Sequence, residues 1–587
     1  MSKLSRREFV YMMAVLGSVP VFANSHTRMT NTNKLEDYYK LKPHGNVRLM
    51  HMTDSHAQLL PVYFREPSVN LGFYGNYGKP PHIVGEKLLD YYGIKGDKRL
   101  EYAYSCVNFE KHAKAMGRVG GFAQIKTVVD FLKNNFGAEK TLLLDGGDTW
   151  QGSATALYTR GKDMVGAMNK LGVDVAVGHW EFTYKAEEVL ANVELLEAEF
   201  LAQNVKVKED SMMNGVEAFD EDTGHAFKPY TIKKMGNARI AIIGQAFPYT
   251  TIANPQRFIP DWTFSINDDG MQEMVDMVRE EEKPDAVIVL SHNGYDTDKK
   301  MAEIVTGIDF IMGGHTHDGV PEAYPVKNEA GTTYVCNAGS NGKFLNVLDL
   351  NIQNGKIKDF KFTLLPIFSD LIPEDKEMKK YIEDVRAPFL KELTREIATT
   401  ENTLFRRGNF NGSWDQIICD ALIDVKGADI SLSPGFRWGT SVMPGQAITF
   451  DDLMTQTAMT YPETYARDIS GKGIKDILED VADNLFNEDP FYQQGGDMVR
   501  TGGISYRINP TAKMGNRISD ITLTKNGHKL ESSKNYKVAG WSTVGSKSPG
   551  EPVWETVETY LKNVKHIANL KVDTPDIVGI KGNPGIV

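Results

Sequence analysis

The sequence predicts an α/β fold with a second, smaller α/β domain at the carboxyl end, and three observations lead to this prediction. The chain has 587 residues, more than a single hydrophobic core usually holds. In its first half, short apolar runs bounded by glycines alternate with helix-like stretches, a pattern typical of strands buried on both faces. From about residue 400, helix and strand signals are mixed, which indicates another domain.

Six apolar runs in the first half are predicted to be strands. They cover residues 47–52, 141–144, 173–177, 238–243, 286–290 and 308–312. Helices are predicted between them, for example over 120–135 and 185–199. Polar motifs follow the ends of these runs, and open α/β sheets place their sites beyond the carboxyl ends of their strands.

The later part of this half predicts a hairpin and a connector. Two alternating runs within 345–364 are separated by Asn354-Gly355, a strong signal for a tight turn. The charged stretch 374–398 is predicted to be a helix that connects the domains. The predicted layout is therefore a first domain over 45–370, a connector over 371–400 and a second domain over 401–570, with an irregular end.

Residues 59–117 form a long, aromatic-rich segment between the first strand and the next. A segment of this length without secondary structure inside a compact domain is usually functional or disordered. Its aromatic side chains predict that it is ordered.

Residues 1–23 indicate an export signal. Arg6-Arg7 begins a twin-arginine pattern, an apolar stretch follows over 9–22, and Ala23 suits a cleavage site. An uncut amphipathic anchor is the alternative. The predicted location is the periplasm, and no other run reaches the ~20 apolar residues of a membrane span.

Composition narrows the possible partners. The chain is 41% hydrophobic and 24% charged, as soluble proteins are, and its net charge of -11 argues against nucleic acid. An anionic small substrate stays possible because a bound metal dominates the local charge. Three widely spaced cysteines predict no disulfide framework, and we expect buried free thiols.

Five of the thirteen histidines follow predicted strands, beside glycine, aspartate or asparagine. The motifs are Asp54-Ser55-His56, Gly146-Gly147-Asp148, Gly178-His179, Ser291-His292-Asn293 and Gly313-Gly314-His315-Thr316-His317. Ligands two residues apart lie on one side of an extended chain, and an aspartate can bridge two ions. The motifs therefore predict a two-metal centre, in which Mn, Fe and Zn all stay possible.

Further candidates surround this centre. Arg437 can hold a sulfonate or phosphate through two parallel hydrogen bonds, although it could instead be a surface arginine stacked on Trp438. The loop 495–500, which contains Asp497, and the loop 409–414 are candidates for the pocket, with ordinary turns as the alternative. Glu181 is predicted to hydrogen-bond a ligand histidine, with simple packing at a strand end as the alternative, and Asn293 is predicted to support the centre from behind.

In this order the motifs resemble those of the calcineurin-like metallophosphoesterases, and the two-domain layout resembles their 5′-nucleotidase branch. Within that branch, residues 61–67, 146–153, 178–183 and 433–439 are most similar to the SoxB family, the thiosulfohydrolases of periplasmic sulfur oxidation. The resemblance covers nearly the whole mature chain. It implies a sandwich of two sheets flanked by helices, with a smaller carboxy-terminal α/β domain that closes over it.

The resemblance also implies the roles of individual residues. It implies two Mn²⁺ ions, one held by Asp54, His56, Asp148 and His317 and the other by Asp148, His179, His292 and His315. Asp148, His179 and Arg437 are then catalytic, and Arg437, Trp180 and Asp497 contact the substrate.

One departure from the nucleotidases is informative. Their motif is Gly-Asn-His-Glu-Phe-Asp, and residues 178–183 of this chain read Gly-His-Trp-Glu-Phe-Thr. His179 therefore replaces the metal-binding asparagine, Trp180 replaces the general-acid histidine, and Thr183 replaces the aspartate that partners this acid. A nucleotide ester expels a basic alkoxide that needs a proton donor. A persulfide is a far better leaving group and needs none.

The resemblance therefore implies hydrolysis, by a metal-bound hydroxide, of the sulfonate on a cysteine of the SoxYZ carrier protein, with release of sulfate. We expect the segment 59–117 to line the channel that admits the carrier's arm. A periplasmic 5′-nucleotidase or related phosphoesterase is the alternative enzyme. A metal-dependent binding protein without turnover is a third hypothesis.

Overall fold

A computed structural model describes residues 38–66 and 70–580, and it confirms the predicted α/β class with a second α/β part. Within the described residues, the first part forms two six-stranded sheets, ordered β14-β13-β1-β2-β3-β4 and β11-β12-β10-β9-β7-β6. The first sheet contains β1 (Val47–Met52), β2 (Thr141–Asp145), β3 (Val175–Ala176), β4 (Glu199–Phe200), β13 (Phe344–Gln353) and β14 (Lys356–Pro366). The second contains β6 (Tyr230–Met235), β7 (Ala238–Gln245), β9 (Ala286–Ser291), β10 (Phe310–Gly313), β11 (Tyr324–Lys327) and β12 (Thr332–Asn337).

The export signal predicted over 1–23 lies outside the described residues.

The two sheets pack face to face, as the alternation along β7 shows. Ile240 and Ile242 point into the core shared with the first sheet. Ala241 and Ile243 point the other way, into a cluster with residues of α12 (Asp268–Met277) and α13 (Tyr295–Ile304). Successive side chains of a strand face opposite sides, so a strand covered on both sides must be apolar throughout. This is why the predicted runs are continuously hydrophobic.

Parallel pairing sets the position of the motifs. β1, β2, β3 and β4 are parallel neighbours in one sheet, and β7, β9, β10 and β12 in the other. The carboxyl ends of parallel strands lie at one edge, so the segments that follow them are close in space. The helices α6 (Phe122–Phe136), α8 (Lys162–Leu171) and α9 (Ala186–Leu195) lie between the strands in sequence. The helix predicted over 185–199 is wrong at its end, because α9 ends at Leu195 and Glu199 begins β4.

The predicted hairpin is confirmed. β13 and β14 are antiparallel, and Gln353 pairs with Lys356 across a two-residue turn. Asn354 and Gly355 have φ angles of 53° and 75°. Positive φ at both positions defines the tight hairpin turn that Asn-Gly favours.

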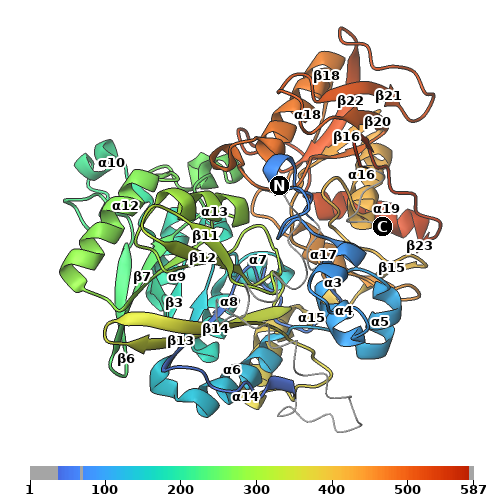
Figure 1. Cartoon of the computed structure of the whole chain (residues 1–587). Helices are drawn as coiled ribbons and strands as arrows, with labels where there is room; N and C mark the ends of the chain where they lie inside the picture. Colours follow the sequence, from blue (N-terminus) through green and yellow to red (C-terminus); the bar gives the residue numbers. More distant parts are fainter. Residues whose placement is uncertain (1–37, 67–69, 581–587) are drawn as a thin grey trace.

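The aromatic segment 59–117 is ordered over its described residues, as predicted. It contains α3 (Gly85–Tyr91), α4 (Lys98–Tyr104) and α5 (Phe109–Met116), and it buries Tyr104 and Phe109 in the main core. Tyr63 bridges to Ser441, so the segment also contacts the second part of the chain. In Figure 1 these blue helices lie at the right of the view, beside the first part and below β15 (Glu396–Thr400) and α17 (Phe450–Thr457).

The expected connector helix is wrong beyond residue 386. α14 (Lys376–Arg386) ends there, and Pro388 interrupts the helix because it has no backbone N–H and its ring clashes with the preceding turn. A short helix, α15 (Leu390–Leu393), follows, and Glu396–Thr400 is the strand β15 instead. β15 pairs with β17 (Ala447–Thr449). The boundaries 45–370, 371–400 and 401–570 stay predictions.

The second part, orange to red in Figure 1, stands beside the first. Its central sheet has the order β18-β22-β16-β19 and is flanked by helices. The strands are β16 (Ile430–Ser433), β18 (Thr464–Ser470), β19 (Arg500–Gly502) and β22 (Asn535–Trp541). The helices are α16 (Ser413–Lys426), α17 (Phe450–Thr457), α18 (Gly471–Phe486) and α19 (Val553–Val564). A smaller sheet contains β20 (Ile504–Ile508) and β21 (Ile518–Leu523).

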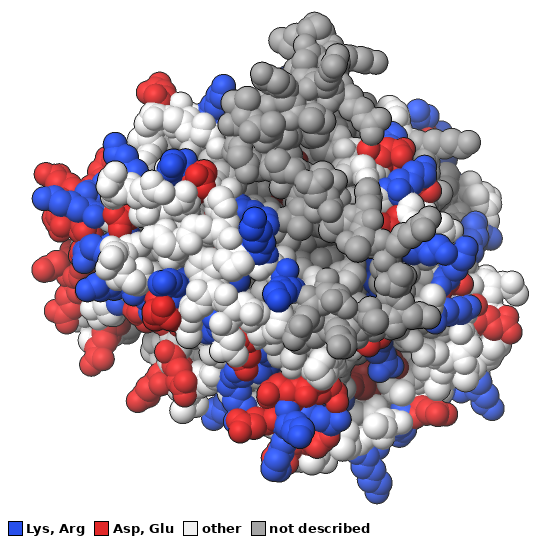
Figure 2. Space-filling view, turned by 60° about the horizontal axis from the view of Figure 1, so that its bottom comes forward, with Lys and Arg blue, Asp and Glu red and all other residues white. Residues whose placement is uncertain are grey.

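Two sequence expectations concern chemistry outside the site. Cys106, Cys336 and Cys419 are free and buried, as predicted. No helix in the part of the chain described here has the length and apolar character needed to cross a membrane. On the face drawn in Figure 2, the described acidic and basic side chains are interspersed.

Candidate metal centre

All seven side chains predicted to bind metal lie just beyond the carboxyl ends of parallel strands. Asp54 and His56 follow β1, Asp148 follows β2, His179 follows β3, His292 follows β9, and His315 and His317 follow β10. The structure brings them into two adjoining buried clusters: Asp54, His56, Asp148 and His317, and Asp148, His179, His292 and His315. Within each cluster one potential ligand atom of every residue lies within 4.8 Å of the others. These are the two groups that the family resemblance implies.

Asp148 belongs to both clusters. Its Oδ2 lies 3.0 Å from Nε2 of His292, 3.2 Å from Nδ1 of His179 and 3.7 Å from Nε2 of His56. One carboxylate oxygen therefore faces imidazoles of both groups. This is the position that a bridging ligand of a two-metal centre occupies.

The geometry of the imidazoles fits a pair of divalent ions. Nε2 of His56 lies 3.0 Å from Nε2 of His317. Two nitrogens bound at about 2.1 Å to one ion, at right angles to each other, would be about 3 Å apart. His292 uses Nδ1 to hydrogen-bond the carbonyl oxygen of Gly146 at 2.5 Å, which leaves Nε2 for a metal. Imidazoles and carboxylates without thiolates suit Mn, Fe or Zn.

The backbone at the centre is strained. Five of the seven residues have positive φ angles between 45° and 71°: Asp54, His56, Asp148, His315 and His317. Residues other than glycine rarely adopt this left-handed region, and each instance costs on the order of 1–3 kcal/mol. Such residues persist where the surrounding structure over-determines them, and their concentration here indicates a functional site.

Burial controls the charge of the side chains. Desolvation lowers the pKa of His315 and of His317 well below the ordinary value, so both rings are neutral, the form that binds metal. Burial alone would raise the pKa of Asp148, but the neighbouring His179 and His292 hold it well below its usual range. The centre therefore presents the neutral rings of His315 and His317 beside a charged carboxylate, whereas Asp148 and Asp54 raise the pKa of His292 to about 10 against the effect of burial.

Glu181 hydrogen-bonds the ligand histidine His179, as predicted, but through the backbone N–H of His179 and not through its ring. Its carboxylate accepts the backbone N–H groups of Asp148, Thr149, Trp150 and His179, at 2.6–3.2 Å. It thereby holds the two turns that carry Asp148 and His179 in a fixed position. The prediction missed this role because sequence spacing does not show which backbone groups lack partners.

We expect Glu181→Gln to destabilise the protein by about 3 kcal/mol or more and to lower its metal content. The amide has one acceptor oxygen, and its NH₂ group would face backbone N–H donors. Each lost hydrogen bond to a charged group is worth about 1.5–3 kcal/mol. Thermal unfolding and metal analysis of the purified variant would measure both effects. Unchanged stability would contradict the role assigned to Glu181.

Asn293 lies behind the centre. Its side-chain oxygen accepts a hydrogen bond from Gln245 at 3.1 Å, and its side chain also bonds Asp298. The described contacts of Asn293 therefore hold the turn after β9, which presents His292, rather than the imidazole itself.

A cavity of about 270 Å³ opens onto the two clusters, and we call it the metal cavity. His56, Asp148, His179, His315 and His317 lie in its wall. Trp180, Phe247, Phe436 and Trp438 form an aromatic part of the wall. The ring of Trp180 packs edge-on against Trp438 and Phe436, at centroid distances of 5.2 and 5.6 Å. Trp180, Arg437 and Asp497 all line this cavity, as their predicted contact with substrate requires.

Arg437 is buried and belongs to the site, so the alternative of a surface arginine is wrong. Its Nη1 donates to the carbonyl oxygen of His315 at 3.0 Å, and its Nη2 donates to that of Gly496 at 2.6 Å. Its Nε lies 3.5 Å from Asp497. The guanidinium group thus ties the loop that carries His315 and His317 to the second part of the chain.

Asp497 is engaged by arginines. Its carboxylate lies 3.3 Å from Arg407, 2.9 Å from Arg500 and 3.5 Å from Arg437. Its contacts favour a role in holding Arg437 over direct contact with substrate. Arg406, Arg500 and Asp415 extend the same buried network. Arg500 lies in the loop 495–500 that the sequence predicted for the pocket. Sequence reasoning missed Arg406, Arg407 and Asp415, and the one available signal was the adjacent pair Arg406-Arg407 before a Gly-Asn loop.

Comparisons with known proteins agree with this architecture. The family described as 5'-nucleotidase, C-terminal domain, matches residues 396–555. Among curated proteins, the chain is 27% identical over 460 residues to the trifunctional nucleotide phosphoesterase YfkN of Bacillus subtilis, covering 70% of this chain but only 30% of YfkN. It is 23% identical over 500 residues to UshA of Yersinia enterocolitica, covering 75% of this chain and 84% of UshA.

Two solved structures are similar over almost the whole chain. The 5'-nucleotidase precursor of Thermus thermophilus is 20% identical to this chain and superposes on it with a TM-score of 0.71. The match covers 91% of this chain and 100% of that one, which shows a shared fold. The sulfate thiohydrolase SoxB of Thermus thermophilus has a TM-score of 0.85 at 33% identity, and the match covers 92% of this chain and 98% of that one. The protein is therefore a hydrolase that belongs to the SoxB family, within the 5′-nucleotidase branch of the calcineurin-like metallophosphoesterases.

Proposed function

We propose that this protein is a thiosulfohydrolase that hydrolyses the sulfonate of a cysteine S-thiosulfonate on a partner protein and releases sulfate. One observation carries the proposal. Outside the two clusters, the described residues that line the metal cavity include no group that can donate a proton to a leaving group at neutral pH.

The ionisable groups of that wall outside the clusters are Arg437, Asp497 and Tyr461. Although burial raises the pKa of Asp497, the arginines Arg407, Arg500 and Arg437 bring it down to about 2, so it carries no proton. Burial raises the pKa of Tyr461 above its ordinary value, and its hydroxyl already donates to the carbonyl oxygen of Ala253. Burial lowers the pKa of Arg437 only to about 10, so it stays charged.

The position of the nucleotidase general acid supports the same conclusion. Trp180 occupies it, and its ring packs among aromatic side chains. Thr183 stands where the acid's aspartate partner would be, and its hydroxyl shares a 2.7 Å hydrogen bond with Thr460. A site without a general acid suits a leaving group of low basicity, and a persulfide anion meets this condition whereas a sugar alkoxide does not.

The reaction balances without an oxidant. Water and R–S–S–SO₃⁻ give R–S–S⁻, SO₄²⁻ and two protons. The bond between the sulfane and sulfonate sulfurs breaks with its electron pair on the persulfide, and a new S–O bond forms. Two divalent ions at the clusters would supply positive charge for the sulfonate oxygens and lower the pKa of water.

The chain's own residues position these groups. Asp148 and the imidazoles hold the two metal positions close together, while Arg437 adds a fixed positive charge beside His315. The aromatic side chains of the wall exclude water from the reacting sulfur atoms, which strengthens these electrostatic interactions. In this proposal the ions are Mn²⁺, the partner is a SoxYZ-type carrier, and the enzyme reaches the periplasm through the twin-arginine signal over residues 1–23.

A paired turnover assay tests the function. We expect the Mn-loaded protein to release sulfate from a carrier whose cysteine bears a thiosulfonate, and to release no phosphate from AMP. The missing proton donor at Trp180 is the reason for the second result. Rapid release of phosphate without sulfate would show a 5′-nucleotidase instead. Tight binding of the loaded carrier without release of sulfate would point to a binding protein.

A further inference from the structure

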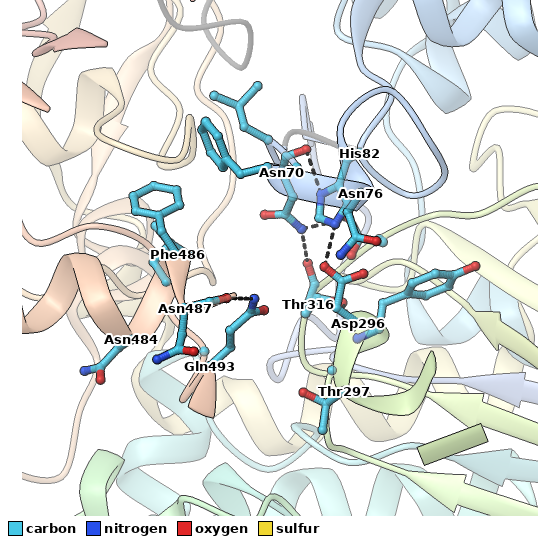
Figure 3. Close-up of a pocket in the computed structure, with 18 of the residues that line it drawn as sticks. Asn70, Asn76, His82, Asp296, Thr297, Thr316, Asn484, Phe486, Asn487 and Gln493 are labelled. Atoms are coloured by element: carbon cyan, nitrogen blue, oxygen red, sulfur yellow. Dashed lines mark hydrogen bonds and ion pairs between the residues drawn. The ribbon is translucent and has the colours of Figure 1, made fainter. Parts of the chain in front are cut away.

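Two more cavities lie near the metal centre. One, of about 300 Å³, is drawn in Figure 3 and shares His315 and Arg437 with the metal cavity, so it continues that cavity past Arg437. The other, of about 140 Å³, has no lining residue in common with either of them. It begins at Ala57 and Gln58, the two residues that follow the candidate ligand His56. We call it the polar cavity, because Gln, Ser or Thr side chains line it at six positions.

The polar cavity opens to solvent at one end and is polar at the other. Leu60 and Arg118 line it and are exposed, whereas Thr440 and Thr455 line it and are buried. No described residue bonds the hydroxyl groups of these two threonines. The volume is large enough for several water molecules, and the unpartnered hydroxyl groups suit them.

Two glutamines connect this cavity with His56. Gln58 donates from Nε2 to the carbonyl oxygens of His56 and Gly152, at 2.9 and 3.2 Å, and no described residue bonds its Oε1. The carbonyl oxygen of Gln151 lies 3.3 Å from Nδ1 of His56, while Nε2 of Gln151 donates to the carbonyl oxygen of Ala458. Oε1 of Gln151 is buried and has no partner in the described part of the chain. Each glutamine therefore contacts His56 and keeps an acceptor available.

The segment on the other side of His56 holds further buried polar atoms. The ring of Trp438 lies 5.7 Å from that of His56. Asn341 donates to the carbonyl oxygen of Gly439 at 3.2 Å, and the side chain of Gln456 fills the place that a Cβ of Gly439 would take. Among the described residues, nothing bonds Nε1 of Trp438, Oδ1 of Asn341 or Oε1 of Gln456. Buried polar groups are almost always hydrogen-bonded, and ordered water serves where protein groups do not reach.

The proposed reaction produces protons that the wall of the metal cavity does not take up. Hydrolysis releases two protons for each sulfate, and the ionisable groups of that wall outside the clusters are Arg437, Asp497 and Tyr461. Arg437 is a cation, three arginines hold Asp497 as an anion, and burial raises the pKa of Tyr461 so that it keeps its own proton. A substrate that fills the cavity also displaces its water. The protons therefore need another route to solvent.

We propose that the polar cavity and the unpartnered polar atoms around His56 hold a chain of water molecules that carries these protons to solvent. Each water passes a proton to the next along a hydrogen bond, so two protons leave for each sulfate and no oxidant or reductant is needed. Gln58 and Gln151 are positioning residues in this chain, because they bind its water and not the substrate. The inference rests on the proposed function and adds the route by which its protons leave.

Two variants interrupt the proposed chain. Gln151→Met removes the available acceptor at nearly constant volume, and Thr440→Val removes one hydroxyl group of the polar cavity. We expect kcat for the loaded carrier to fall about tenfold in Gln151→Met and about threefold in Thr440→Val, less than the roughly 10²- to 10⁴-fold of a direct catalytic proton transfer. KM and metal content should not change. Imidazole added to the buffer is small enough to enter the polar cavity and accept protons there, so it should restore kcat.

Gln416→Met is the matched control. Gln416 is 5% exposed, against 3% for Gln151, and its side chain also makes hydrogen bonds, to Asp420 and Asp573. It lies on α16 and lines neither the metal cavity nor the polar cavity. We expect its kcat to be unchanged and insensitive to imidazole. An unchanged kcat in both test variants, or a loss that imidazole does not restore, would overturn the inference.

A high-resolution crystal structure gives a second measurement that requires no turnover. We expect ordered water on Oε1 of Gln58 and on Oε1 of Gln151. A dry region at these atoms would overturn the inference and leave the proposed function intact. Failure of the unaltered protein to release sulfate would overturn the proposed function, even with those water molecules in place.

Discussion

Asp148→Asn is expected to remove most of the bound metal and to lower kcat on the order of 10³-fold or more. The substitution keeps the shape of the side chain but replaces the carboxylate that both clusters share. A neutral amide cannot balance two divalent ions that are held close together, so both positions lose affinity. Metal analysis after dialysis, combined with the sulfate-release assay, measures the two effects on one sample.

Asp163→Asn is the control for Asp148→Asn. Asp163 is also a buried aspartate, and burial raises its pKa to about 6, but it lies outside both clusters. We expect this variant to keep two metal ions per chain. If Asp148→Asn retained both ions and its activity, the clusters would not be the metal centre.

Gly495→Ala is expected to lower kcat/KM by about 10²-fold while the protein stays folded. A Cβ at this position would lie 1.9 Å from Nε2 of His315, so either the imidazole or the loop 495–496 must move. His315 belongs to one cluster, and Gly496 accepts a hydrogen bond from Arg437. A displacement of about 1 Å in such groups is enough for a loss of this size.

The chain offers a matched control for this substitution. Gly445 has a φ angle of 84°, close to the 76° of Gly495, and a Cβ on Gly445 would meet nothing within 4 Å. Both alanine variants therefore carry the left-handed backbone cost of about 1 kcal/mol, and only Gly495→Ala adds the clash. Equal activity of the two variants would show that the contact between Gly495 and His315 does not matter for the reaction.

Much of the candidate centre could be predicted because its residues follow local rules. Continuous apolar runs predict strands buried on both faces, and Asp54 to His56 and His315 to His317 stand at the ends of two such runs. Asn354-Gly355 predicts its own turn from the φ angles that it tolerates. These signals depend on only a few neighbouring residues, so they can be recognised without knowledge of the three-dimensional structure.

The connector and the supporting residues could not be predicted as well. The helix expected over 374–398 ignored Pro388, and it missed that residues 396–400 find a strand partner in Ala447–Thr449. The role of Glu181 depends on which backbone N–H groups lack partners, which is a property of the folded turns. The arginine network around Asp497 joins segments about 90 residues apart along the chain.

By itself, the sequence determined the α/β class, the positions along the chain of the strands that carry the motifs, and the set of side chains able to hold two ions. Residue type and short spacing express these features, because side-chain direction repeats every two residues in a strand. Only the tertiary structure decided that Glu181 accepts the backbone N–H groups of two turns, that Asp497 holds three arginines, and that Gly495 touches His315. These contacts join residues far apart in sequence, and packing of the two parts of the chain against each other creates them.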